Sequence, residues 1–122
     1  LYTYGFIGIS QFGQYNRKFQ GKLDQNGAVV IASPRGGGEL GLARQVDFKS
    51  DMFAKMNDVV AVANQLRADF PNTPIVFSGR SFGGLLSLML AVHHPDKFDA
   101  FVSVVPLVSF MEFFNHGLFG QF

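Results

Sequence analysis

Apolar positions follow two alternating patterns along the chain. Four short stretches are almost continuously apolar or β-branched, which is typical of strands in a parallel sheet; they are residues 1–10, 27–33, 75–78 and 99–105. Between and after them, apolar residues recur every three or four positions or form a longer apolar run, which predicts helices over 11–26, 55–70, 81–94 and 107–116. This alternation predicts an α/β fold, with a mostly parallel sheet and flanking helices.

The helix over 55–70 has the clearest pattern. Its apolar residues fall on one face: Met56, Val59, Val60, Ala63, Leu66 and Phe70. Asp58 near its start and Arg67 near its end suit the helix dipole. We therefore interpret Asp58 as a charge at the start of the helix and not as a catalytic acid.

The turn after the third strand carries the strongest chemical signal. It reads Gly-Arg-Ser-Phe-Gly over residues 79–83, and an apolar helix follows. A strand, a sharp turn and a helix with serine at the apex form a nucleophile elbow. The residues two before and two after the serine must be small because the two backbones nearly touch, and Gly79 and Gly83 meet this demand. The alternative is that Ser81 only caps the helix, where serine is favoured.

A second glycine-rich turn follows the second strand, with Pro-Arg-Gly-Gly-Gly-Glu at residues 34–39. Consecutive glycines reach positive φ and allow close backbone approach. The turn lacks the Gly-Lys-Ser/Thr ending of a phosphate-binding loop and the spacing of a dinucleotide fingerprint, so nucleotide binding is not favoured. Strand ends of a parallel sheet share one edge, so this turn, Gly5-Phe6 and Ser81 should cluster there.

Composition narrows the class of partner. The 122 residues fit one core and carry a net charge of +1, with Lys and Arg scattered singly apart from Arg17-Lys18. We interpret these cations as solvated surface and expect no nucleic acid partner. The chain has no cysteine, hence no disulfide and no thiolate metal site. We expect no cofactor, and a reducing, cytoplasmic location.

The most apolar stretch does not predict a membrane span. Residues 101–114 are interrupted by Pro106 and Glu112, and they are fewer than the roughly 20 residues that a spanning helix needs. We therefore expect no transmembrane segment and no membrane partner. Leu1 is not an initiator methionine and already lies in a strand pattern, so we expect the chain to be a piece of a longer protein.

Four segments together resemble the prolyl oligopeptidase family in order and spacing. They are Tyr-Gly-Phe at 4–6, Pro-Arg-Gly-Gly-Gly-Glu-Leu-Gly at 34–41, Gly-Arg-Ser-Phe-Gly-Gly-Leu-Leu at 79–86 and Pro-Asp-Lys-Phe-Asp-Ala at 95–100. The resemblance covers nearly the whole chain. It implies that residues 1–122 are the N-terminal part of an α/β-hydrolase peptidase catalytic domain. The rest of that domain and a β-propeller would belong to other parts of the protein.

The resemblance also implies roles for individual residues. Ser81 matches the nucleophile of a serine peptidase acting on short peptides, many of them cut after proline. The backbone N–H of Phe82 and the hydroxyl of Tyr4 match the two oxyanion donors. Tyr2 is a competitor for the second role, and Tyr4 as a packed strand aromatic is the alternative. Phe82 replaces the asparagine of many prolyl-specific members, which changes what lines the pocket and leaves proline specificity open.

The resemblance places the general base outside residues 1–122. In the family the triad runs Ser, Asp, His, and both partners lie downstream, beyond Phe122. His93 and His94 end the helix that Ser81 starts, roughly 20 Å away at 1.5 Å per residue, so we exclude them and assign them to the helix end. His116 falls in a segment that is non-catalytic in the family.

Two alternatives to the peptidase remain open. A carboxylic ester hydrolase or lipase-like enzyme uses the same elbow, although the glycine-rich turn at 34–39 favours the peptidase. The other alternative is a truncated product that is inactive, because a serine without its base keeps only residual catalysis.

Overall fold

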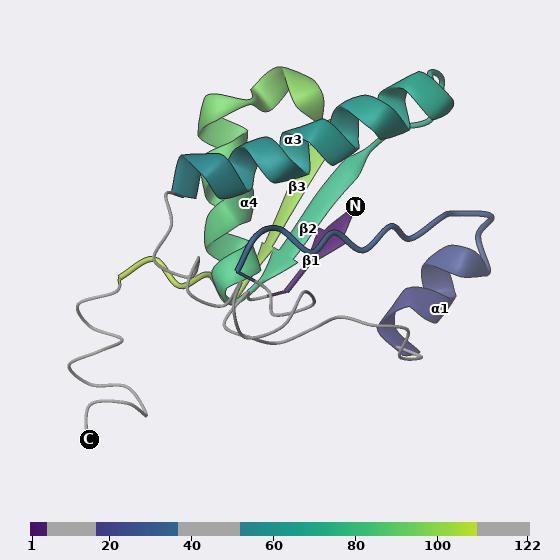
Figure 1. The fold of residues 1–122 in the computed structure, drawn as a ribbon. Coiled ribbons are helices and arrows are strands. Elements are labelled where there is room, and N and C mark those ends of the chain that lie inside the picture. Colours follow the sequence, from purple (N-terminus) through teal and green to yellow (C-terminus); the bar gives the residue numbers. More distant parts are fainter. Residues whose placement is uncertain (5–16, 37–51, 110–122) are drawn as a thin grey trace.

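The computed structural model describes residues 1–4, 17–36 and 52–109 (Figure 1). The strands are β1 (Tyr2–Thr3), β2 (Val76–Arg80) and β3 (Ala100–Val104), and the helices are α1 (Arg17–Leu23), α3 (Met52–Asp69) and α4 (Phe82–His93), with a short 3-10 helix at Pro95–Lys97. Strands and helices alternate along the chain, so the predicted α/β class is confirmed.

The sheet is parallel and has the order β1-β2-β3. Tyr2 pairs with Ser78 on one side and forms an isolated parallel bridge with Ile31 on the other. That bridge is all that forms of the strand predicted over 27–33, and Ile31 is exposed there. The prediction of a buried strand over 27–33 was therefore wrong, although the parallel direction of its pairing was right.

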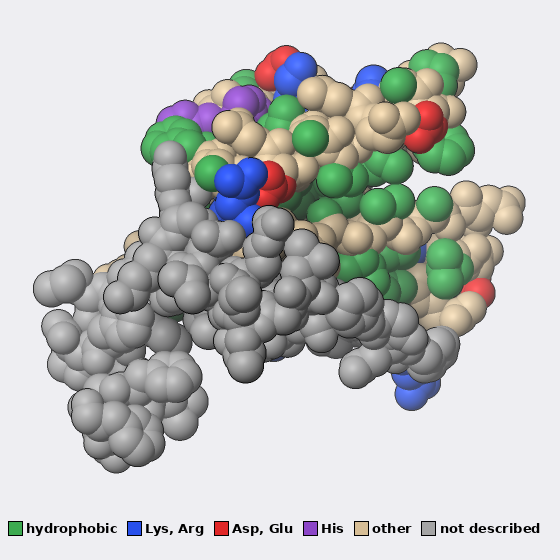
Figure 2. Space-filling model, in the orientation of Figure 1, with side chains coloured by type: hydrophobic (Ala, Val, Ile, Leu, Met, Phe, Trp, Pro, Cys, Tyr) green, Lys and Arg blue, Asp and Glu red, His purple; other side chains and the backbone are tan. Residues whose placement is uncertain are grey.

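The hydrophobic core lies between the helices and one face of the sheet. In β2, Phe77 and Gly79 are buried while Val76 and Arg80 are exposed, because successive side chains point to opposite faces. α3 crosses over the strands beside α4 (Figure 1). The core cluster comprises Met56, Val59, Ala63, Ile75, Phe77, Leu86, Leu90 and Phe98. Figure 2 shows hydrophobic side chains along the lower border of α3 in this view.

The end of α1 illustrates a local sequence rule. The N–H of Asn26 bonds to the carbonyl of Leu23 and that of Gly27 to the carbonyl of Lys22, with Asn26 in the left-handed region at φ 57. This is a Schellman cap, which asparagine tolerates. It ends the helix that was predicted over 11–26; residues 11–16 of that prediction lie outside the described residues.

Two predictions about charged residues of α3 were wrong. The helix begins at Met52, so Asp58 lies beyond its first turn, which holds no acidic residue; only Arg67 in the last turn suits the dipole. Lys55, expected on the solvated surface, is fully buried. The first half of α3 therefore carries charges that face other parts of the fold.

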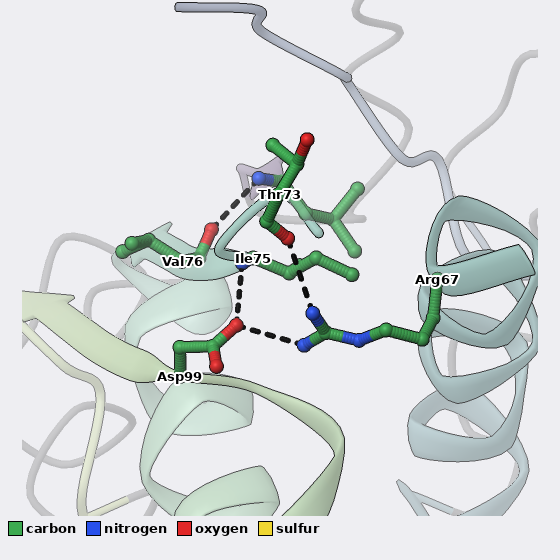
Figure 3. A network of polar contacts seen from close by, with 6 residues as sticks. Arg67, Thr73, Ile75, Val76 and Asp99 are labelled. Atoms are coloured by element: carbon green, nitrogen blue, oxygen red, sulfur yellow. Dashed lines mark hydrogen bonds and ion pairs between the residues drawn. The ribbon is translucent and has the colours of Figure 1, made fainter. Parts of the chain in front are cut away.

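A polar network fixes the opposite end of α3, at the amino edge of the sheet (Figure 3). One oxygen of Asp99 accepts hydrogen bonds from Arg67 at 2.7 Å and from the N–H of Ile75 at 2.6 Å. Arg67 also donates to the carbonyl of Thr73 at 3.1 Å. These bonds join the end of α3 to the starts of β2 and β3, and the bond from Arg67 is the main cause that lowers the pKa of Asp99.

Two further predictions meet the limits of the described residues. The helix expected over 107–116 has not begun by residue 109, and its remainder lies outside them. Among the helices of the described part, none is both long enough and apolar enough to cross a membrane.

Candidate active site at the turn between β2 and α4

Ser81 occupies the turn between β2 and α4 with a strained backbone. Its φ is 58° and its ψ is −118°, and its side chain makes no capping hydrogen bond. A positive φ is uncommon for a residue with a Cβ and costs about 1–3 kcal/mol. An ordinary capping serine has an extended backbone, and its side-chain oxygen accepts a hydrogen bond from a backbone N–H in the first turn of the helix. The geometry therefore does not fit the alternative in which Ser81 is merely a cap.

The turn requires its glycines because backbones meet there. A Cβ on Gly79 would lie 1.9 Å from the carbonyl oxygen of Gly83. A Cβ on Gly83 would lie 2.4 Å from the carbonyl oxygen of Thr3, so the end of β1 also packs closely against the start of α4. Gly84 faces the carbonyl of Val104 in the same way, at 3.0 Å. The demand for small residues at 79 and 83, predicted from the pentapeptide, is confirmed.

β3 and the segment after it hold the turn in place. The N–H of Ser81 donates to the carbonyl of Val104 at 3.0 Å, and the N–H of Leu107 donates to the carbonyl of Ser81 at 3.2 Å. The hydroxyl of Ser103 donates to the carbonyl of Gly84 at 2.9 Å. Ser103 carried no signal in the sequence, because its partner lies in another element.

Phe82 begins α4 directly after Ser81. Its N–H lies in the first helical turn, where N–H groups have no acceptor within the helix and point out of its end. The ring is only 3% exposed, and the ammonium of Lys55 lies 6.0 Å from its centroid. The ring therefore packs inward toward Lys55 of α3.

The two tyrosines of the first segment differ in their surroundings. Tyr2 pairs with Ser78 within the sheet and meets the ring of Phe19 edge-on at 5.0 Å. Burial raises the pKa of the Tyr2 hydroxyl, and Arg80 nearby acts in the opposite direction. Tyr4 is half-buried and follows the end of β1, at the edge where Ser81 lies. Among the described residues, Tyr4 is therefore the tyrosine at that edge, whereas Tyr2 lies within the sheet.

Thr3 anchors the segment that precedes Tyr4. It is fully buried, and its hydroxyl donates to the carbonyl of Ala32 at 2.8 Å. The N–H of Ala32 donates to the carbonyl of Tyr2 at 2.9 Å. The two bonds tie the end of β1 to the chain that leads into the glycine-rich turn.

The start of the glycine-rich turn is bound to α3. The carboxylate of Asp58 accepts bonds from the guanidinium of Arg35 at 2.8 and 2.7 Å and from its backbone N–H at 3.0 Å. The side-chain bond from Arg35 is the main cause that lowers the pKa of Asp58, and partial burial opposes it. Gly36 has a φ of 91°, as expected of a glycine in a turn. Residues 37–41, Gly5 and Phe6 lie outside the described part of the chain.

The histidines of α4 lie at its far end. α4 has 12 residues from Phe82 to His93, which is a length of about 18 Å. His93 lies in the last turn and meets the ring of Phe53 edge-on at 5.2 Å. Neither His93 nor His94 is within hydrogen-bond reach of Ser81, which requires about 3 Å. His116 lies outside the described residues.

Comparison with known proteins places the chain in a family. The model of the prolyl oligopeptidase family matches residues 14–119. An uncharacterized peptidase, y4nA, of Sinorhizobium fredii is 35% identical over 118 residues, covering 93% of this chain and 16% of that protein. The protein of Bacillus subtilis named "Probable aminopeptidase YbaC" is 30% identical over 112 residues, covering 89% and 34%. No solved structure matches the chain at a significant level.

A shorter match points to another hydrolase. The monoglyceride lipase of Mus musculus is 34% identical over 59 residues, covering 48% of this chain and 20% of the lipase. The chain thus spans between 16% and 34% of the length of these relatives. Three parallel strands with flanking helices, together with the family match, identify a partial α/β-hydrolase fold, as the motifs predicted.

The first prediction concerns Gly79. In Gly79→Ala the new methyl would overlap a carbonyl oxygen of the backbone, so we expect a loss of on the order of 4 kcal/mol in the free energy of unfolding. Gly21→Ala is the control, because a Cβ there meets nothing within 4 Å; it should stabilise α1 by about 0.5–1 kcal/mol. Urea unfolding of the natural polypeptide that contains this chain measures both. Equal effects of the two variants would contradict the tight contact.

The second prediction concerns pH. The folded pKa of Asp58 lies below its ordinary value of 3.8, so the stability it adds is present above that value and is lost as pH falls through the folded pKa. Asp58→Asn should therefore lower the urea midpoint at pH ~7, and the difference from wild type should shrink as the pH falls below about 4. Arg35→Gln should show the same dependence. A difference that does not change with pH would contradict this origin.

Proposed function

The chain belongs to the prolyl oligopeptidase family, and on this basis we propose that it carries the nucleophile of a serine peptidase acting on short peptides. The observation that carries the proposal is the backbone of Ser81, at φ 58° between β2 and α4 with no capping bond from its hydroxyl. A hydroxyl at the apex of such a turn projects from the sheet edge toward a substrate. Peptidase-named relatives that cover 93% and 89% of the chain support the same class.

The proposed chemistry is acyl transfer. The oxygen of Ser81 attacks the peptide carbonyl while a base takes its proton, and the carbonyl oxygen becomes an oxyanion. The N–H of Phe82 and the hydroxyl of Tyr4 donate to that oxyanion. The base gives that proton to the leaving amine, and an acyl-enzyme remains. Water then attacks the acyl group while the base takes its proton. The acid is released as the base returns the proton to Ser81.

The proposal assigns the base to a histidine and its orienting group to an aspartate encoded beyond Phe122. His93 is at the opposite end of α4 from Ser81, so it does not supply this proton. The remainder of the catalytic domain and a β-propeller that limits substrates to short peptides complete the proposed protein. The proposal includes cleavage after proline as one candidate specificity, which a comparison of peptide substrates tests.

A second candidate function is hydrolysis of a carboxylic ester. The match of 34% identity to a monoglyceride lipase over 59 residues favours it, since both classes use the elbow and the oxyanion donors. The peptidase is preferred because the family model and the peptidase-named relatives extend over most of the chain, whereas the lipase match covers 48% of it.

The third prediction tests the nucleophile. A fluorophosphonate probe should label Ser81 strongly in a polypeptide extended past Phe122 by its encoded sequence, and negligibly in residues 1–122 alone, because the unassisted hydroxyl is a weak nucleophile. Mass spectrometry of the labelled peptide identifies the site, and Ser81→Ala is the control. Strong labelling of the short chain would show that the base lies within it.

The fourth prediction separates the two candidate reactions. The extended protein should hydrolyse a short proline-containing peptide amide with a kcat/KM at least about tenfold above that for a short-chain monoacyl ester, once each rate is divided by the uncatalysed rate of its substrate. A matched peptide with alanine in place of proline tests the specificity. Turnover of the ester alone would assign the chain to the ester hydrolases.

A further inference from the structure

The first half of α3 contacts two segments that lie far apart in the sequence, the turn at Arg35 and the start of α4 at Phe82. Asp58 binds the turn at Arg35, and Lys55 lies over the ring of Phe82. Residues three apart lie on neighbouring positions of a helix surface, so both contacts come from one face of one helix turn. A rigid helix thereby fixes the spacing of two separate parts of the sheet edge.

The contact of Asp58 acts on main chain as well as on a side chain. An exposed ion pair contributes little by itself. Here the same carboxylate also accepts the backbone N–H of Arg35 at 3.0 Å, and the fork of the guanidinium fixes its orientation. The neighbouring residues Pro34 and Gly36 are buried. The main chain of the turn is therefore held at a set distance from α3.

The position of this turn is passed on to Tyr4 through a short bonded path. Arg35 lies three residues after Ala32. The carbonyl of Ala32 accepts the hydroxyl bond of Thr3, and its N–H bonds to Tyr2. Ala32 is thus bonded to the residues directly before Tyr4, so a shift of the turn moves the segment that carries the Tyr4 hydroxyl.

The contact of Lys55 acts on the other donor. Lys55 is fully buried, and its ammonium lies 6.0 Å from the Phe82 ring, within the range of a cation–π interaction. The ring and the N–H of Phe82 belong to the first residue of α4. Fixing the ring against α3 therefore fixes the direction of the N–H beside Ser81.

We propose that Asp58 and Lys55 are positioning residues that set the separation of the two oxyanion donors, Tyr4 and Phe82. This inference rests on the proposed function and adds a role for α3 to it. Donors must lie within about 2.7–3.1 Å of one oxygen to stabilise it, and here they come from different segments. One helix that contacts both segments meets that requirement.

The experiment compares an oxygen ester with its thiono analogue, in which sulfur replaces the carbonyl oxygen. Sulfur is larger and accepts hydrogen bonds weakly, so oxyanion donors accelerate the oxygen ester far more. The ratio of the two kcat/KM values reports on the donors and not on the amount of folded protein. It is measured in the extended natural polypeptide, for wild type, Asp58→Asn and Lys55→Met.

Asp99→Asn is the matched control. Like Asp58, Asp99 binds an arginine and a backbone N–H. Its arginine is Arg67 of α3, and its contacts lie at the amino edge of the sheet (Figure 3). We expect Asp58→Asn to lower the oxygen-to-thiono ratio about tenfold, mainly through kcat, because a misplaced donor costs up to about 100-fold. Lys55→Met should act in the same direction, and Asp99→Asn should leave the ratio unchanged.

A further variant covers the case in which Asp58→Asn does not fold. Arg35→Lys keeps the positive charge but loses the fork, and it should lower the ratio as well. An unchanged ratio in the folded variants, with turnover still dependent on Ser81, would overturn the positioning role alone. Turnover that persists in Ser81→Ala would overturn the proposed function and this role with it.

Discussion

The close contact between the backbones of β2 and α4 is the constraint on which the described site depends. At Gly79 the space for a Cβ is already taken by the carbonyl of Gly83, and at Gly83 by the carbonyl of Thr3. The contact forces Ser81 into a positive φ, at a cost of about 1–3 kcal/mol. Bonds from Ser81 to Val104 and from Leu107 to Ser81 offset that cost. The strained serine is thus a property of three strands and a helix, and not of the pentapeptide alone.

The first half and the last turn of α3 use the same chemistry for different purposes. At each place an aspartate binds an arginine and also a backbone N–H: Asp99 binds Arg67 and the N–H of Ile75, and Asp58 binds the side chain and the N–H of Arg35. Exposed ion pairs contribute little to stability, so the value of both pairs lies in the main chain that they fix. At the amino edge this aligns strands, whereas at the carboxyl edge it sets the geometry beside Ser81.

The family and the site together limit the chemistry that this chain can support. An elbow serine and two candidate oxyanion donors belong to acyl transfer in general, and they do not distinguish an amide from an ester. That distinction depends on the walls of the substrate pocket and on the leaving group. Phe82 packs inward with only 3% of its surface exposed, so its ring offers little surface to such a wall.

Much of the fold and the central residue of the site could be predicted from the sequence. Strand and helix periods and the small residues at 79 and 83 are local requirements, so a few neighbouring residues are enough to reveal them. The length of the second strand was predicted wrongly, because Ile31 has only one neighbouring strand among the described residues, so its pairing and burial depend on context.

Only the tertiary structure decided which residues support the site. Thr3 meets Ala32 across 29 positions, Asp58 meets Arg35 across 23, and Ser103 meets Gly84 across 19. The burial of Lys55 against Phe82 is of the same kind. The local sequence around each of these residues does not distinguish it from a residue exposed to solvent. Its partner depends on which segments the sheet and helices bring together. The sequence alone thus determined the elbow, and the packing of α3, β1 and β3 determined what holds it.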